Sequence, residues 1–164
     1  MSESVDQLFE MAIAAERASE ALYRGLQRKF AHHPELAGFW DRYAVEEACH
    51  AMWLVRLRGR ADPLQLSAPA DPLLLREARR ALALGVDKRL EGVKDLDDAY
   101  ELVNELENSE TNAIFDFLIT SFAEDEETVA FLRAQLTEHI GRLVQGFPAA
   151  FRSTGRRREL KALD

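Results

Sequence analysis

Glu47-Ala-Cys-His50 is the stretch that decides how this chain folds, because it places two ionisable side chains at positions typical of a helix core. The same stripe carries apolar side chains at spacings of three and four residues: Leu36, Trp40, Tyr43, Leu54 and Leu57. That spacing predicts one face of a helix that opens at Pro34 and ends near Gly59. Residues three apart on a helix point the same way, so Glu47 and His50 should be buried side by side.

Three more segments have the same helical period. The first runs from about Ser4 to Lys29, and Ser4 with Gln7 has the spacing of a capping box. The second starts at Asp95 and keeps its apolar stripe to Ser121, and the last follows an acidic turn and ends near Gly146. Long stretches without proline or strand-like alternation predict an all-α protein.

The order of these segments predicts a four-helix bundle with one long crossover. Residues 1–147 would form this single domain, and the connection over 58–94, broken by prolines, would contain a short helix from Leu73 to Leu84. Short loops join helices one and two and helices three and four, so the crossover lies between helices two and three, which is the ferritin-like connectivity. We expect residues 148–164, with their basic run, to be a solvated tail.

Ionisable side chains interrupt all four stripes. These are Glu16, Glu47, His50, Glu107, Glu110 and His139. A carboxylate buried in an apolar bundle costs several kcal/mol unless a cation neutralises it, and the stripes carry no Lys or Arg. The pattern therefore indicates a metal site, and oxygen with imidazole ligands suits iron or manganese, with zinc also compatible.

The chain resembles the ferritin-like superfamily, and within it the rubrerythrin-like di-iron carboxylate proteins, from Val5 to about Leu143. Each half of that pattern has a Glu on its first helix and Glu-x-x-His on its second. Glu16 and Glu107 match the first element, and Glu47-Ala-Cys-His50 matches the second. Tyr23 is similar to a tyrosine beyond the first glutamate, and Glu110 to an additional carboxylate of rubrerythrins.

The fourth helix departs from the family pattern. Leu136-Thr-Glu138-His139 has Leu136 where a glutamate is expected. Glu138 lies about 100° around the helix from His139, so it could replace the missing ligand only through a rotated or distorted helix. By this resemblance, loss of the glutamate would weaken metal binding at the second position, and Glu110 could compensate.

The resemblance implies an oxidoreductase that holds two iron ions and acts on peroxide or dioxygen, in a chain whose lack of a signal-peptide pattern or apolar span predicts a cytoplasmic location. An external electron donor would be needed, because a single cysteine excludes a four-cysteine iron site within these residues. Oxidation of ferrous iron is a related function, and a homodimer is the expected assembly. The alternative is a helical interaction or sensor module with a degenerate metal site.

Composition excludes other classes of function. The net charge of −8 disfavours binding to nucleic acid, and no apolar run has the roughly 20 residues of a membrane span. The N-terminus has neither the basic start nor the apolar centre of a signal peptide, so the chain is expected to be soluble. Cys49 has no basic neighbour on its own face and is expected to be a small buried residue.

Overall fold

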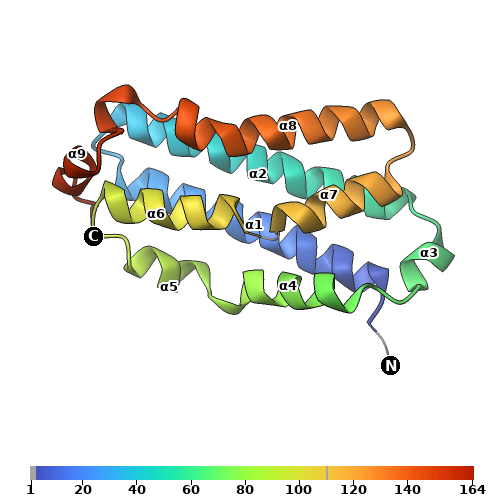
Figure 1. Cartoon of the computed structure of the whole chain (residues 1–164). Helices are drawn as coiled ribbons and strands as arrows, with labels where there is room; N and C mark the ends of the chain where they lie inside the picture. The colour runs from blue at the N-terminus through green and yellow to red at the C-terminus, as the bar shows by residue number, and fades with distance from the viewer. Residues whose placement is uncertain (1–2, 110) are drawn as a thin grey trace.

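The first two helices form an antiparallel pair. The computed structural model describes residues 3–109 and 111–164, which are helical and contain no strand. α1 spans Val5–Lys29 and α2 spans Pro34–Arg60, and the two lie side by side (Figure 1). Ser4 and Gln7 make the predicted capping box, and Pro34 opens α2, where its missing N–H costs no hydrogen bond.

The connection after α2 consists of three short helices. They are α3 (Pro63–Ser67), α4 (Pro72–Ala83) and α5 (Val86–Glu91). α4 confirms the predicted short helix, while α3 and α5 were not predicted. The side chains of Asp62 and Asp71 cap α3 and α4, and α4 and α5 pack along α1. The connection thus returns the chain along the full length of the molecule (Figure 1).

The predicted continuous helix from Asp95 to Ser121 is wrong, because the chain forms two helices in line. α6 spans Leu96–Glu107 and α7 spans Thr111–Phe122, and Asp95 caps α6 as expected. Asn108 donates from its side chain to the Asn104 carbonyl, and Asn112 donates to the Glu107 carbonyl at 2.6 Å. These side chains offer the backbone alternatives to helical hydrogen bonds, which explains why α6 ends at Glu107.

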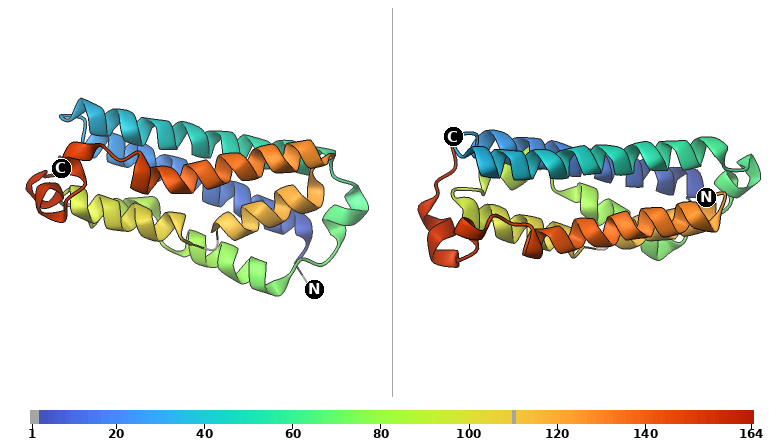
Figure 2. Two further views of the ribbon diagram at one scale, coloured as in Figure 1. Left: turned by 45° about the horizontal axis from the view of Figure 1, so that its top comes forward. Right: turned by 90° about the horizontal axis from the view of Figure 1, so that it is seen from above.

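The last long helix, α8, spans Glu126–Gln145 and begins at the cap residue Asp125. It contacts α7, and the ring of Phe131 lies 6.5 Å from that of Trp53 on α2. α1, α2, the α6–α7 pair and α8 run along one common direction (Figure 2). Of the helices within 3–109 and 111–164, none is long and apolar enough to cross a lipid bilayer.

The expectation of a solvated tail is wrong, because residues 149–160 fold back onto α6. They form a 3-10 turn, η1 (Ala149–Phe151), and a short helix, α9 (Thr154–Glu159). Arg157 pairs with Asp97 at 2.8 Å, and its guanidinium lies 4.2 Å from the ring centre of Tyr100. Leu160 is buried. Sequence periodicity missed this because the contacts join residues about 60 positions apart.

Two apolar clusters fill the interior, one towards each end of the long helices. Near α9 the buried side chains include Tyr23, Phe30, Trp40, Tyr43, Val103, Leu143 and Phe147. Near α3 they include Phe9, Ala12, Leu54, Ile114, Leu118, Leu132 and Leu136. Along each long helical segment, the two clusters leave a gap of a few residues between them. The ionisable stripe residues occupy this gap.

Candidate metal centre

Five of the six predicted ligands meet in the gap between the apolar clusters. Glu16 comes from α1, Glu47 and His50 from α2, Glu107 from the last residue of α6, and His139 from α8. All five are buried, with exposed fractions between 1% and 4%. The sixth predicted ligand, Glu110, lies outside the described residues.

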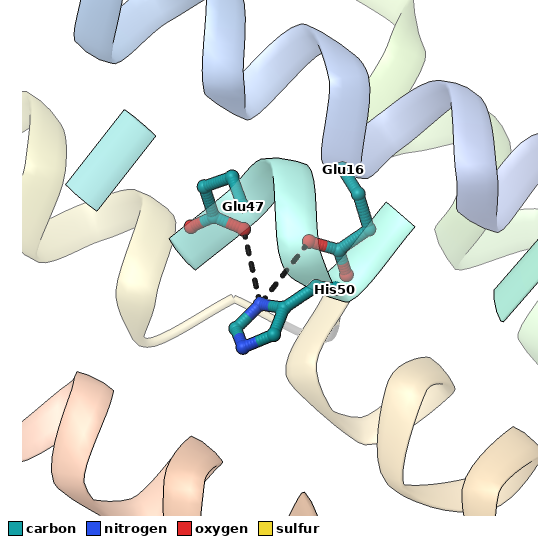
Figure 3. Close-up of side chains that lie close together, drawn as sticks. All are labelled: Glu16, Glu47 and His50. Carbon is teal, nitrogen blue, oxygen red and sulfur yellow. Dashed lines mark hydrogen bonds and ion pairs between the residues drawn. The ribbon is translucent and has the colours of Figure 1, made fainter. Parts of the chain in front are cut away.

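The first group of ligands joins α1 and α2. Oxygen and nitrogen atoms of Glu16, Glu47 and His50 all lie within 4.8 Å of one another. His50 Nδ1 is 3.2 Å from Glu47 Oε2 and 3.6 Å from Glu16 Oε2 (Figure 3). Both carboxylates turn towards one ring nitrogen, so a cation placed among these atoms would have three protein ligands.

The second group joins α2, α6 and α8. Atoms of Glu47, Glu107 and His139 also lie within 4.8 Å of one another. His139 Nε2 is 3.0 Å from Glu47 Oε1 and 3.1 Å from Glu107 Oε2. This group has the same composition as the first: two carboxylates and one imidazole.

Glu47 belongs to both groups and links them. One of its oxygens faces His50 and the other faces His139, while the two imidazole ring centres lie 5.2 Å apart. A carboxylate can offer one oxygen to each of two neighbouring cations. Glu47 is thus shared by the two ligand groups, one oxygen facing each imidazole.

The pKa values of the two neighbouring carboxylates shift in opposite directions. Removal from water and the charge of Glu47 raise the pKa of Glu16 to about 8. Burial would also raise the pKa of Glu47, but hydrogen bonds with His139 and His50 outweigh it and hold that pKa well below the usual range. At neutral pH the metal-free pair therefore shares one negative charge, carried by Glu47.

Both imidazoles are cationic at neutral pH in the metal-free protein. Burial disfavours the charge on His50, but Glu16 and Glu47 raise its pKa to about 9. For His139 burial acts the same way, and Glu107, Glu46 and Glu47 raise its pKa to about 12. Protons on these rings and on Glu16 thus balance the buried carboxylates. A divalent cation at either group would replace protons with metal charge.

Two tyrosines surround the second group. Tyr23 is fully buried and donates its hydroxyl hydrogen to Glu107 Oε1. Burial and the charge of Glu107 raise its pKa well above the usual value, so it remains a hydrogen-bond donor. Tyr43 donates to the backbone carbonyl of His139 at 3.0 Å, which holds α8 against α2 at this level.

Glu46 also contacts the centre, and the sequence pattern did not identify it. Its Oε2 lies 2.6 Å from His139 Nδ1, and its Oε1 pairs with Arg142. A carboxylate at Nδ1 fixes the tautomer that directs Nε2 at a metal. Glu46 lies off the apolar stripe of α2, so the adjacent pair Glu46-Glu47 was the only signal available from the sequence.

On α8, the side chain one helical turn before His139 is Leu136, as the sequence indicates. Leu136 is buried in the apolar cluster near α3, and no carboxylate replaces it on that face of α8. The Glu138 side chain is 73% exposed and pairs with Arg142 at 3.0 Å. Since α8 is not rotated at this point, Glu138 does not join the centre.

The expectation that Cys49 is buried is wrong. Its side chain is exposed, because the turn that directs His50 inward directs Cys49 to the surface of α2 facing α8. Comparisons of the chain with protein-family models, with curated proteins and with solved structures found no match.

Proposed function

We propose that the chain is a rubrerythrin-like di-metal carboxylate protein built on a ferritin-like four-helix bundle. In this interpretation the four bundle members are α1, α2, the in-line pair α6 and α7, and α8. The segment 61–95, with α3, α4 and α5, is the long crossover. The order of these elements and the meeting of ligands from all four members support the proposal.

The position of Glu47 between the two imidazoles is the observation that carries the proposal. An isolated buried carboxylate would need only one counter-ion, but Glu47 directs each oxygen at a separate imidazole, and each imidazole has a second carboxylate. Oxygen and imidazole ligands without thiolate favour iron or manganese, and zinc is also compatible. We take two iron ions as the native content.

The proposed activity is reduction of peroxide or dioxygen. Two bound ferrous ions would supply two electrons, which with two protons convert hydrogen peroxide into two molecules of water. The protein contributes orientation and exclusion of water: Tyr23 fixes Glu107, Glu46 fixes His139, and Phe115 packs 4.8 Å from the ring of His50. Apolar clusters lie on both sides of the ligands along the bundle.

Repeated turnover requires a source of electrons. The 164 residues include one cysteine, so they cannot form a four-cysteine iron site that would supply electrons. We propose an external electron donor, and a homodimer as the assembly. A related function is oxidation of ferrous iron that is then passed on to another site. It would use the same ligands, and it would begin with the same transfer of electrons from ferrous iron to the oxidant.

Leu136 favours one alternative. A family member lacking the fourth-helix glutamate could keep the bundle as an interaction or sensor module with a reduced metal site. That alternative expects no more than one tightly bound ion per chain and no reaction with peroxide.

Peroxide-dependent oxidation of bound ferrous iron tests the proposed activity. The chain is loaded anaerobically with Fe²⁺, mixed with hydrogen peroxide, and followed by the absorbance of ferric iron. We expect rapid oxidation in the wild type and none above the rate of free iron in a Glu47→Ala, His50→Ala chain. An unchanged rate in that variant would exclude this centre as the seat of the reaction.

A further inference from the structure

A small cavity lies between α2 and α8 and reaches the candidate centre. Its volume is about 120 Å³. The lining residues are Glu46, Cys49, His50, Gln135, Glu138 and Arg142. His50 is a ligand of the first group, and Glu46 contacts the ligand His139. The cavity therefore connects the surface between the two helices with His50 of the first ligand group, beside the Glu46–His139 contact.

Two carboxylates, Glu138 and Glu46, line this cavity, and a third, Glu47, is more deeply buried and outside its lining. The Glu138 side chain is 73% exposed, that of Glu46 is 30% exposed, and that of Glu47 is 6% exposed. Arg142 lies between the outer two and pairs with both, so it is a protein cation on a path of anions. The Glu138 partner is largely exposed, so Arg142 can exchange that contact for water at low cost.

We propose that this cavity is the access route by which divalent cations reach the centre. Glu138 is the first carboxylate a cation meets, and Glu46 is the second. Arg142 is the counter-ion that gives up its pairing as the cation passes. This inference rests on the proposed function, since it assumes that the ligand groups bind metal.

Cys49 provides a direct way to obstruct the route. It is the single cysteine of the chain, it is exposed, and it lines the cavity. A bulky maleimide on its sulfur would fill a volume of about 120 Å³. Uptake of Co²⁺ by the metal-free chain, followed by its visible absorption, should slow at least tenfold after labelling. The final amount bound should equal that of the unlabelled chain.

The matched control carries the same label elsewhere. In a Cys49→Ala, Glu101→Cys chain the maleimide is attached to an exposed position of α6, away from the cavity. Labelling this chain should leave its own Co²⁺ uptake rate unchanged. Equal uptake rates for wild-type chains with and without the Cys49 label would overturn the access route while leaving the proposed metal centre intact. Absence of Co²⁺ binding by the unlabelled wild type would instead overturn the proposed function and the route with it.

A second variant tests the access route without a label, in case the maleimide lowers the amount of metal bound. It reverses the charge of Glu138. Glu138→Lys places a second positive charge at the mouth of the cavity, on an exposed side chain that folding does not require. Electrostatic steering then predicts uptake roughly three- to tenfold slower, with a smaller effect at high salt. Glu101→Lys makes the same change of charge on α6 and should have little effect. Equal rates for these two variants would contradict the route.

Discussion

Glu16→Gln separates the stability of the metal-free protein from its capacity to bind metal. Burial and the neighbouring Glu47 raise the pKa of Glu16 from 4.5 to about 8. Between these pH values the folded chain must take up a proton that the unfolded chain lacks, so stability falls as the pH rises. At pH 7, about 2.5 pH units above the usual pKa and at about 1.4 kcal/mol per unit, this costs up to ~3.5 kcal/mol.

Glutamine has the size of a protonated glutamate and takes up no proton. The metal-free variant should therefore be more stable than the wild type by up to ~3.5 kcal/mol at pH 7, and by little near pH 4.5. The gain is an upper limit because the two carboxyl groups of Glu16 and Glu47 titrate together. The same variant should lose the ion at the first group, since an amide is a weaker ligand than a carboxylate.

Urea denaturation in the presence of a chelator, followed by circular dichroism, measures this difference across pH 5 to 8. Glu101→Gln on the exposed face of α6 is the control, and should change the free energy of unfolding by less than about 0.5 kcal/mol. A Glu16→Gln chain that is no more stable than the wild type at pH 7 would refute the reasoning. So would a stability gain that shrinks as the pH rises.

Three other expectations follow from the centre and from the tail. Because His50, His139 and Glu16 hold protons at pH 7, metal binding should release about three protons per chain and weaken as the pH falls, and a pH-stat titration that detects no release would contradict this. His139→Ala should reduce bound Co²⁺ from about two ions per chain to about one, because Glu16, Glu47 and His50 remain, and loss of both ions in a titration would argue against two separate groups. Asp97→Ala leaves Arg157 buried without its partner and should cost about 3 kcal/mol in urea denaturation, whereas a loss below about 1 kcal/mol would mean that the tail is held by other contacts.

The positions of the ligands could be predicted because the helical period is fixed. Each apolar stripe is interrupted by a polar ligand: Glu16, Glu47, Glu107 or His139. When the apolar face of a helix is buried, the polar residues on that face are buried as well. Tyr23, seven residues after Glu16, lies on the same face for the same reason, and its hydroxyl contacts Glu107.

Features that depend on particular side-chain contacts, local or distant, could not be predicted from periodicity. The spacing of three and four residues continues past Glu107 to Ile114, so periodicity alone gave no sign that α6 ends at Glu107. The side-chain hydrogen bonds of Asn108 and Asn112 that compete with the helix become visible only in the fold. Likewise, Glu46 and Arg157 gain their partners from helices far away in the chain.

The metal content of the chain tests the central claim most directly. The metal-free protein is loaded anaerobically with Fe²⁺, freed of excess iron, and measured by elemental mass spectrometry against protein concentration. The shared position of Glu47 between two ligand groups predicts about two iron ions per chain in the wild type, and fewer in Glu47→Gln. A wild-type value near zero would contradict a metal centre at this site.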